Sequence, residues 1–128
     1  MKSILVDTNV FLHFLLNDIP KQKAACEKLL NKAKHNEIKL SVAQATVFEI
    51  DFILRKYYLY EKSVVIKQIK SLVATNYIDI ESRDIFIKAI TLYEKECVSL
   101  VDCFLLSKAS IEASELFTFD QKLQKLKG

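Results

Sequence analysis

The stretch SILVDTNVFLHFLLND, residues 3–18, joins a short β-branched apolar run to a longer apolar run through Asp7, Thr8 and Asn9. The first run, residues 3–7, has the length and composition of a buried strand, and from Val10 the pattern lengthens into a helix that ends near residues 17–20. The three polar residues therefore stand at a strand-to-helix junction. Turn chemistry alone explains such residues. The alternative is that they form one part of a functional site whose other residues lie elsewhere in the sequence.

The apolar periodicity of the remaining chain predicts alternating helices and strands. We expect strands over residues 37–43, 77–81 and 115–119, and helices over residues 20–34, 43–57, 61–74, 83–96, from 102 onward and over 120–126, with Ser82 as the cap of the helix from 83. Strands that alternate with helices form mostly parallel sheets with helices on both faces. The prediction is a single domain, residues 1–128, with an α/β fold: a three-layer α/β/α sandwich around a mostly parallel sheet of four or five strands.

The composition excludes several classes of protein. The chain has 128 residues with a formal net charge of +3, and its one Gly and one Pro are residues 128 and 20. A P-loop or a dinucleotide-binding turn needs internal glycines, so nucleotide binding by those routes is excluded. No apolar run reaches the roughly 18 residues of a membrane span, and the apolar N-terminal run is too short for a signal peptide. We therefore expect a cytoplasmic protein that does not enter a membrane.

The three cysteines, Cys26, Cys97 and Cys103, are widely separated. They form no Cys-x-x-Cys pair and no paired histidines accompany them, so neither a disulfide framework nor a zinc site is indicated. We interpret all three as reduced thiols in the core.

Four acidic residues follow the expected strands or begin the helices after them. Asp7 ends the first strand, Asp102 begins a helix, and Asp120 follows residues 115–119; Glu49 lies in the first turns of the helix after the second strand. Phe52 follows Glu49 by three positions, which we interpret as placing Glu49 on the helix side that faces the protein. Since ligands bind at the carboxyl ends of parallel strands, we expect the four acids at one edge of the sheet.

Crowded carboxylates repel one another, and a divalent cation removes that cost. An all-oxygen ligand set suits Mg²⁺ or Mn²⁺. Two such ions about 4 Å apart can activate a water and stabilise the leaving oxygen of a phosphodiester. Thr8, Asn9 and Thr118, which lie beside the acids in the sequence, are candidates for orienting that water.

Four motifs in order resemble those of the PIN domain family, in particular the small VapC-like toxins of toxin–antitoxin pairs. They are ILVDTNVFLHFLLND, VAQATVFEIDFIL, SLVDCFLLSKA and LFTFDQKLQKL, and together they cover nearly the whole chain. The resemblance implies an endoribonuclease that depends on one or two Mg²⁺ or Mn²⁺ ions. It makes Asp7, Glu49 and Asp102 the core metal ligands, completed by Asp120. Ser99 stands where many relatives have a further Asp.

The same resemblance implies an RNA substrate such as tRNA or rRNA, a cognate antitoxin protein as partner, and a homodimer. A catalytically silent PIN-like module that binds RNA or protein is the alternative, and Ser99 keeps it open. An aspartyl-phosphate phosphatase would also begin with an Asp after the first strand, but it needs a second acid where this chain has Asn9.

Aromatic and basic residues follow Glu49 on the same expected helix. Tyr57, Tyr58 and Tyr60 are suited to stack on RNA bases or to contact a neighbouring subunit, because tyrosine is enriched at interfaces. Arg55 and Lys56 are candidate phosphate contacts or solvated helix charges.

Overall fold

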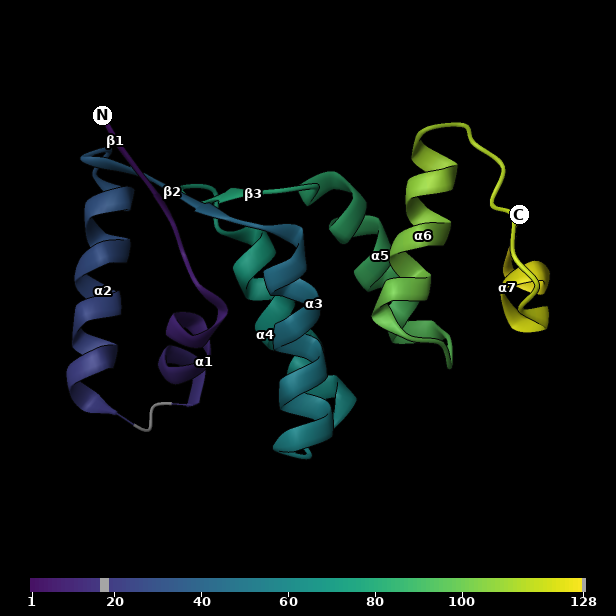
Figure 1. Cartoon of the computed structure of the whole chain (residues 1–128), viewed down its shortest axis with the longest axis horizontal. Helices are drawn as coiled ribbons and strands as arrows, with labels where there is room; N and C mark the ends of the chain where they lie inside the picture. The colour runs from purple at the N-terminus through teal and green to yellow at the C-terminus, as the bar shows by residue number, and fades with distance from the viewer. Residues whose placement is uncertain (17–18, 128) are drawn as a thin grey trace. The chain divides into compact units, whose positions relative to one another are not determined.

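The computed structural model of the chain describes residues 1–16 and 19–127 (Figure 1). Its contacts divide the chain into two units, Met1–Glu81 and Ser82–Gly128. The described strands, β1 to β3, belong to the first unit together with helices α1 to α4 and the π-helix η1, and the second unit contains α5, α6 and α7. The first helix was expected to end near residues 17–20, of which 17 and 18 lie outside the described residues.

Three parallel strands form the sheet of the first unit: β1 (Lys2–Leu5), β2 (Ile38–Val42) and β3 (Asp79–Ile80), in the order β1-β2-β3. Leu5 is in register with Ser41, and Val42 with Ile80. The ladder continues past the strands, because the Val6 N–H donates to the Ser41 carbonyl at 3.0 Å. The carboxyl ends of the three strands are therefore level at one edge, as the sequence predicted.

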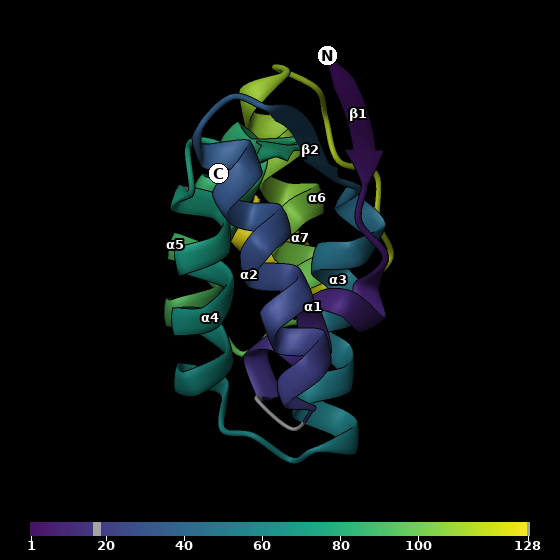
Figure 2. The ribbon, with the colours of Figure 1, turned by 90° about the vertical axis from the view of Figure 1, so that its left-hand side faces the viewer.

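Four α-helices and a π-helical turn accompany this sheet: α1 (Thr8–Leu16), α2 (Pro20–Lys34), α3 (Gln44–Phe52), η1 (Ile53–Tyr57) and α4 (Lys62–Ala74). Helices α1 and α2 lie side by side (Figure 2). Pro20 occupies the first turn of α2, where its missing N–H would have no partner in any helix. Leu40, Val47 and Leu54 are at most 1% exposed and belong to the core. The helices expected over 20–34, 43–57 and 61–74 are confirmed.

Helices α5 (Arg83–Lys95) and α6 (Leu100–Ile111) form the core of the second unit, followed by α7 (Gln121–Leu126). The rings of Phe86 and Phe104 meet with their centroids 5.0 Å apart. The expected capping role of Ser82 is wrong: its side chain makes no capping hydrogen bond. Its backbone is left-handed, with φ at 62°, and its carbonyl accepts from the Phe86 N–H at 3.0 Å.

The strand expected over residues 115–119 is not present; this segment is irregular. Phe117 and Phe119 are 81% and 87% exposed. Thr118 instead makes local bonds, since its Oγ1 accepts from the Asp120 N–H at 3.0 Å and its carbonyl accepts from Gln124 Nε2 at 2.8 Å. Local side-chain bonds of this kind compete with strand pairing. In the described residues the sheet therefore has three strands, where four or five were expected.

Cys26 and Cys103 are buried free thiols, as expected. The expectation is wrong for Cys97, which is exposed because it lies in the bend between α5 and α6. Among the described helices, none is both long and apolar enough to cross a membrane.

Candidate metal site

Asp7 stands at the carboxyl edge of the sheet, two residues after β1 and directly before α1. Its carbonyl accepts the Val10 N–H at 3.1 Å, which closes the first turn of the helix. The side chain is exposed, and its carboxylate has no hydrogen bond or ion pair with another described residue. The backbone of Asp7 is thus held in the first helical turn, and its carboxylate oxygens remain available to a ligand.

Thr8 connects this junction to α3. Its side chain is 6% exposed, as is that of Thr46, and Thr8 Oγ1 donates to Thr46 Oγ1 at 3.3 Å. The hydroxyl of Thr8 therefore points into the protein in this structure and joins α1 to the first turns of α3. Asn9, the next residue, is exposed on the first turn of α1.

Glu49 lies on α3 three residues beyond Thr46, so it follows Thr46 by one turn along a similar helix face. Our interpretation that this side faces the protein interior is wrong, because Glu49 is exposed and Phe52 is 64% exposed. Ile50 is 1% exposed and occupies the buried face instead. The Glu49 carboxylate has no partner among the described residues, so this unit presents two free acids from neighbouring elements.

Glu81 is an acid at the same edge that our reading of the sequence missed. Its N–H donates to the Val42 carbonyl at 3.0 Å, and its Oε1 accepts from the Gln44 N–H at 2.8 Å. A carboxylate at a helix N-terminus satisfies an unpaired N–H and interacts favourably with the helix dipole. Glu81 therefore fixes the start of the helix that bears Glu49. Its position as the last residue of the strand expected over 77–81 was the available signal.

In the second unit, Asp102 lies in the first turn of α6 and is half-buried. Ser99 caps this helix, with its Oγ accepting from the Asp102 N–H at 3.1 Å. The Asp102 carboxylate makes no bond to another described residue. Ser99 therefore has a structural function in positioning Asp102.

Asp120 is the N-cap of α7, with its Oδ1 accepting from the Leu123 N–H at 3.1 Å. Thr118 accepts the Asp120 N–H, so the two residues form one local turn. The cap engages one carboxylate oxygen of Asp120, while the side chain as a whole is exposed.

The four candidate acids fit a hard divalent cation in their chemistry, since carboxylate oxygens are ligands that Mg²⁺ and Mn²⁺ prefer. Within either unit, no group of three or more His, Cys, Asp or Glu side chains suited to a metal ion is found among the described residues. The first unit brings together the elements that carry Asp7 and Glu49, and the second carries Asp102 and Asp120.

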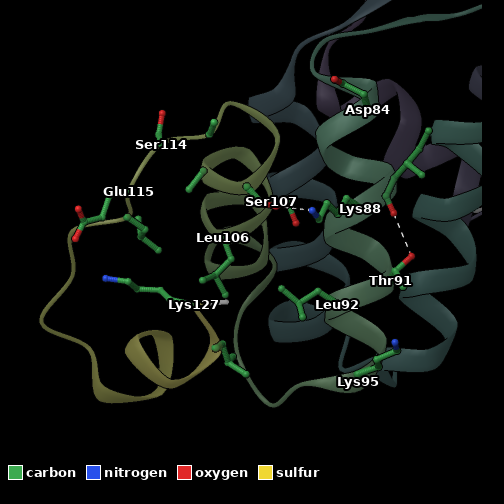
Figure 3. A pocket seen from close by; sticks show the side chains of 16 residues that line it. Asp84, Lys88, Thr91, Leu92, Lys95, Leu106, Ser107, Ser114, Glu115 and Lys127 are labelled. Atoms are coloured by element: carbon green, nitrogen blue, oxygen red, sulfur yellow. Dashed lines mark hydrogen bonds between the residues drawn. The ribbon is translucent and has the colours of Figure 1, made fainter.

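A cavity of about 790 Å³ lies within the second unit, between α5, α6 and the chain that leads to α7 (Figure 3). Its lining includes Ile87, Lys88, Leu92 and Leu106. Ser107 Oγ is buried there without a hydrogen-bond partner in the described structure. None of the four candidate acids lines this cavity, so it is separate from the candidate metal site.

The fold and the acidic strand-to-helix junctions define an α/β protein with a parallel sheet and carboxylates at its carboxyl edge. The family model described as "PIN domain" matches residues 4–128, and the chain belongs to the PIN domain family. This assignment confirms the three-layer α/β/α class that the sequence predicted. The chain is also 24% identical over 123 residues to the VapC ribonuclease of Aquifex aeolicus, covering 95% of this chain and 90% of that protein. No solved structure matches the chain significantly.

Proposed function

We propose that this chain is a metal-dependent endoribonuclease that hydrolyses RNA phosphodiester bonds. The observation that carries the proposal is the junction in the first unit, where the Thr8–Thr46 hydrogen bond joins Asp7 to the helix of Glu49 at the carboxyl edge of a parallel sheet. Membership of the PIN family and the similarity to a protein named VapC ribonuclease support this assignment.

In this proposal Asp7, Glu49, Asp102 and Asp120 bind one or two Mg²⁺ or Mn²⁺ ions, and the two units are parts of a single PIN domain. A bound ion supplies Lewis-acid activation of the attacking water and neutralises charge on the phosphate. Because Asp7 and Glu49 have no protein partner among the described residues, ion binding would not break an existing salt bridge of either acid.

The polar residues next to the acids hold and orient them. Thr118 accepts the Asp120 N–H and so fixes the backbone of that acid, while Thr8 keeps the Asp7 junction against α3. Asn9 has an exposed amide one position further along α1, which we assign to hydrogen bonding with the attacking water or the substrate.

A cleavage assay tests the reaction. Purified protein should cut a panel of tRNAs and rRNA fragments when Mg²⁺ or Mn²⁺ is present, and the products should disappear with excess EDTA and return when the metal is restored. Equal cutting in EDTA and in metal would show that the acids do not act through a metal ion.

We further propose that the protein is a cytoplasmic toxin, that a cognate antitoxin protein blocks it, and that it acts as a homodimer. Expression without the partner should then arrest bacterial growth, whereas expression of Asp102→Asn should not. Equal arrest by both forms would indicate that the protein sequesters a cellular component and does not cleave RNA. Sedimentation of the purified protein would give its oligomeric state.

A catalytically silent PIN-like module that binds RNA or protein is the second candidate, and the position of Ser99 favours it. Its hydroxyl is used as a helix cap, so this position supplies no carboxylate. Calorimetric titration with Mn²⁺ separates the two candidates. An active site should bind metal and lose that binding in Asp7→Asn, whereas a silent module should show no site that depends on the acids.

A further inference from the structure

The end of the helix that carries Glu49 exposes a group of large apolar and aromatic side chains. Tyr57 is 77% exposed, Tyr58 41% and Leu59 79%. We call Tyr57, Tyr58 and Tyr60 the tyrosine cluster, because their rings form a row. The ring centroids of Tyr57 and Tyr58 are 5.0 Å apart, and those of Tyr58 and Tyr60 are 6.4 Å apart. A contiguous exposed patch of this kind marks a binding surface more often than a random surface position does.

The π-helical turn η1 explains why these rings face solvent. Leu54 is fully buried, and in a regular α-helix the residues three and four positions later would share its buried face. Here the turn is wider, with the Tyr58 N–H donating to the Ile53 carbonyl at 3.1 Å and the Tyr60 N–H to the Leu54 carbonyl at 2.9 Å. Such turns are rare and occur frequently at functional sites.

The ring geometry leaves surface for stacking. Tyr57 and Tyr58 meet at an interplanar angle of 73°, and Tyr58 and Tyr60 at 59°. An edge-to-face contact covers at most one face of a ring. Tyr57, at the exposed end of the row, therefore has an open face on which a planar group can stack.

The charge of the segment distinguishes between partners. Residues 52–62 contain Arg55, Lys56 and Lys62 but a single acid, Glu61. Protein interfaces are enriched in tyrosine and arginine but depleted in lysine, whereas surfaces that bind single-stranded nucleic acid combine aromatic side chains with positive charge, including that of lysine. Lys56 and Lys62 therefore favour the second pattern.

We propose that the tyrosine cluster binds unpaired bases of the RNA, with Tyr57 as the principal stacking residue; this inference rests on the proposed function. Eight residues along α3 and η1 separate Tyr57 from Glu49, which is at most about 12 Å at the α-helical rise of 1.5 Å per residue, because the π-helical turn is wider. At about 3.4 Å per stacked nucleotide, that is three to four nucleotides from the cleaved bond. The cluster therefore contacts bases that flank the cleavage site, not the cleaved bond itself.

Binding without cleavage tests the inference. Fluorescence anisotropy with labelled decauridine, in EDTA and in the non-cleaving Asp7→Asn background, would report affinity alone. Tyr57→Ala should weaken binding about tenfold, in the range measured for one stacked base. Tyr57→Phe, which keeps the ring, should bind as the parent does. An abasic strand of the same length and charge should bind Tyr57→Ala and its parent equally.

Tyr77→Ala is the matched control, because Tyr77 is a 36% exposed tyrosine of the same unit that lies before the amino end of β3, away from the carboxyl edge of the sheet. This substitution should leave the affinity for decauridine unchanged. Unchanged decauridine affinity in Tyr57→Ala overturns the inference even if the protein cleaves RNA. A shift from dimer to monomer in Tyr57→Ala with unchanged RNA affinity would assign the cluster to a subunit interface and overturn it too. Selective loss of affinity in a protein that never cleaves would uphold the inference and refute the proposed function.

Discussion

Thr8 and Thr46 lie 38 residues apart in the chain, yet Thr8 Oγ1 donates a hydrogen bond to Thr46 Oγ1 across 3.3 Å in the interior. This contact joins the residue after Asp7 to the helix of Glu49. It fixes the relation between two candidate metal ligands without using either carboxylate.

Removal of one hydroxyl should cost more than removal of both. Thr8→Val leaves the Thr46 hydroxyl buried without its partner, which should lower the free energy of unfolding by about 1–3 kcal/mol. The double variant Thr8→Val/Thr46→Val replaces the pair with apolar groups of similar shape and should recover most of that loss. Urea denaturation of the parent, Thr8→Val, Thr46→Val and the double variant measures the coupling between the two hydroxyls. Strictly additive losses of stability would contradict that coupling.

Asp7 and Glu49 should be needed for activity and not for folding. Asp7→Asn and Glu49→Gln should each abolish metal-dependent cleavage, while the free energy of unfolding changes by less than about 0.5 kcal/mol, because both side chains are exposed. Asp79→Asn is the matched control. Asp79 is an exposed acid of β3 whose ion pair with Lys39 spans 3.8 Å, and its loss should leave cleavage intact. Full activity of Asp7→Asn would refute the proposed site.

Glu81 should stabilise the start of α3. Glu81→Ala removes the acceptor of the Gln44 N–H and should lower the free energy of unfolding by about 1 kcal/mol, as other lost helix caps do. Glu81→Gln keeps an acceptor oxygen and should lose less. Glu37→Ala, at another exposed position, controls for the loss of a surface charge. Thermal unfolding gives the values, and equal effects of Glu81→Ala and Glu37→Ala would exclude the capping role.

The turn after α6 should be stabilised by glycine. Ala113 has φ at 53°, and the Ser114 N–H donates to the Ala109 carbonyl at 2.8 Å, a helix end at which glycine is preferred. Ala113→Gly should raise the free energy of unfolding by about 0.5–1 kcal/mol because it removes the left-handed strain. Ala109→Gly, inside the helix, should lower it by about 1 kcal/mol. A destabilised Ala113→Gly would show that this φ carries no strain.

The cysteines should differ in reactivity. Burial raises the pKa of the Cys26 thiol above 9.0, and the nearby Glu27 carboxylate adds to the rise, so this thiol should resist alkylation at pH 8 while exposed Cys97 reacts. Mass spectrometry after timed iodoacetamide treatment checks the order. Since the unfolded thiol loses its proton first, the contribution of Cys26 to stability is complete below pH 9.0 and falls as the pH rises further. Cys26→Ala should remove that part of the alkaline decline.

Much of the fold followed from local patterns in the sequence. Pro20 and the helical spacing of apolar residues after it predicted α2, and short β-branched runs predicted the three strands. Both predictions succeed because the buried side of a helix or strand repeats at a fixed spacing in the sequence. The segment of Phe117 and Phe119 has a similar composition, but a strand also needs a backbone partner. Instead, the Thr118 hydroxyl accepts the Asp120 N–H, and the Asp120 carboxylate caps α7 by accepting the Leu123 N–H.

The candidate site, like the fold, was predictable only where a local sequence pattern records it. The strand-to-helix junction identified Asp7, and the register of β1 and β2 confirms that α3 begins at the same edge. The buried Thr8 hydroxyl and the capping bond of Glu81 depend on contacts between distant residues, which no local pattern records. That Asp102 and Asp120 share one metal site with Asp7 and Glu49 stays a prediction.

The capping bond of Glu81 has a further consequence for the chain that follows it. Glu81 is the last residue of the first unit, and Ser82 begins the second with no linker between them. The chain therefore leaves the first unit at a point anchored to the helix of Glu49. One residue thus has two structural roles: the Glu81 N–H extends the ladder beside β2, and the Glu81 carboxylate holds the first turn of α3. A substitution that removes the Glu81 carboxylate would therefore loosen the start of α3 without removing the backbone bond to Val42.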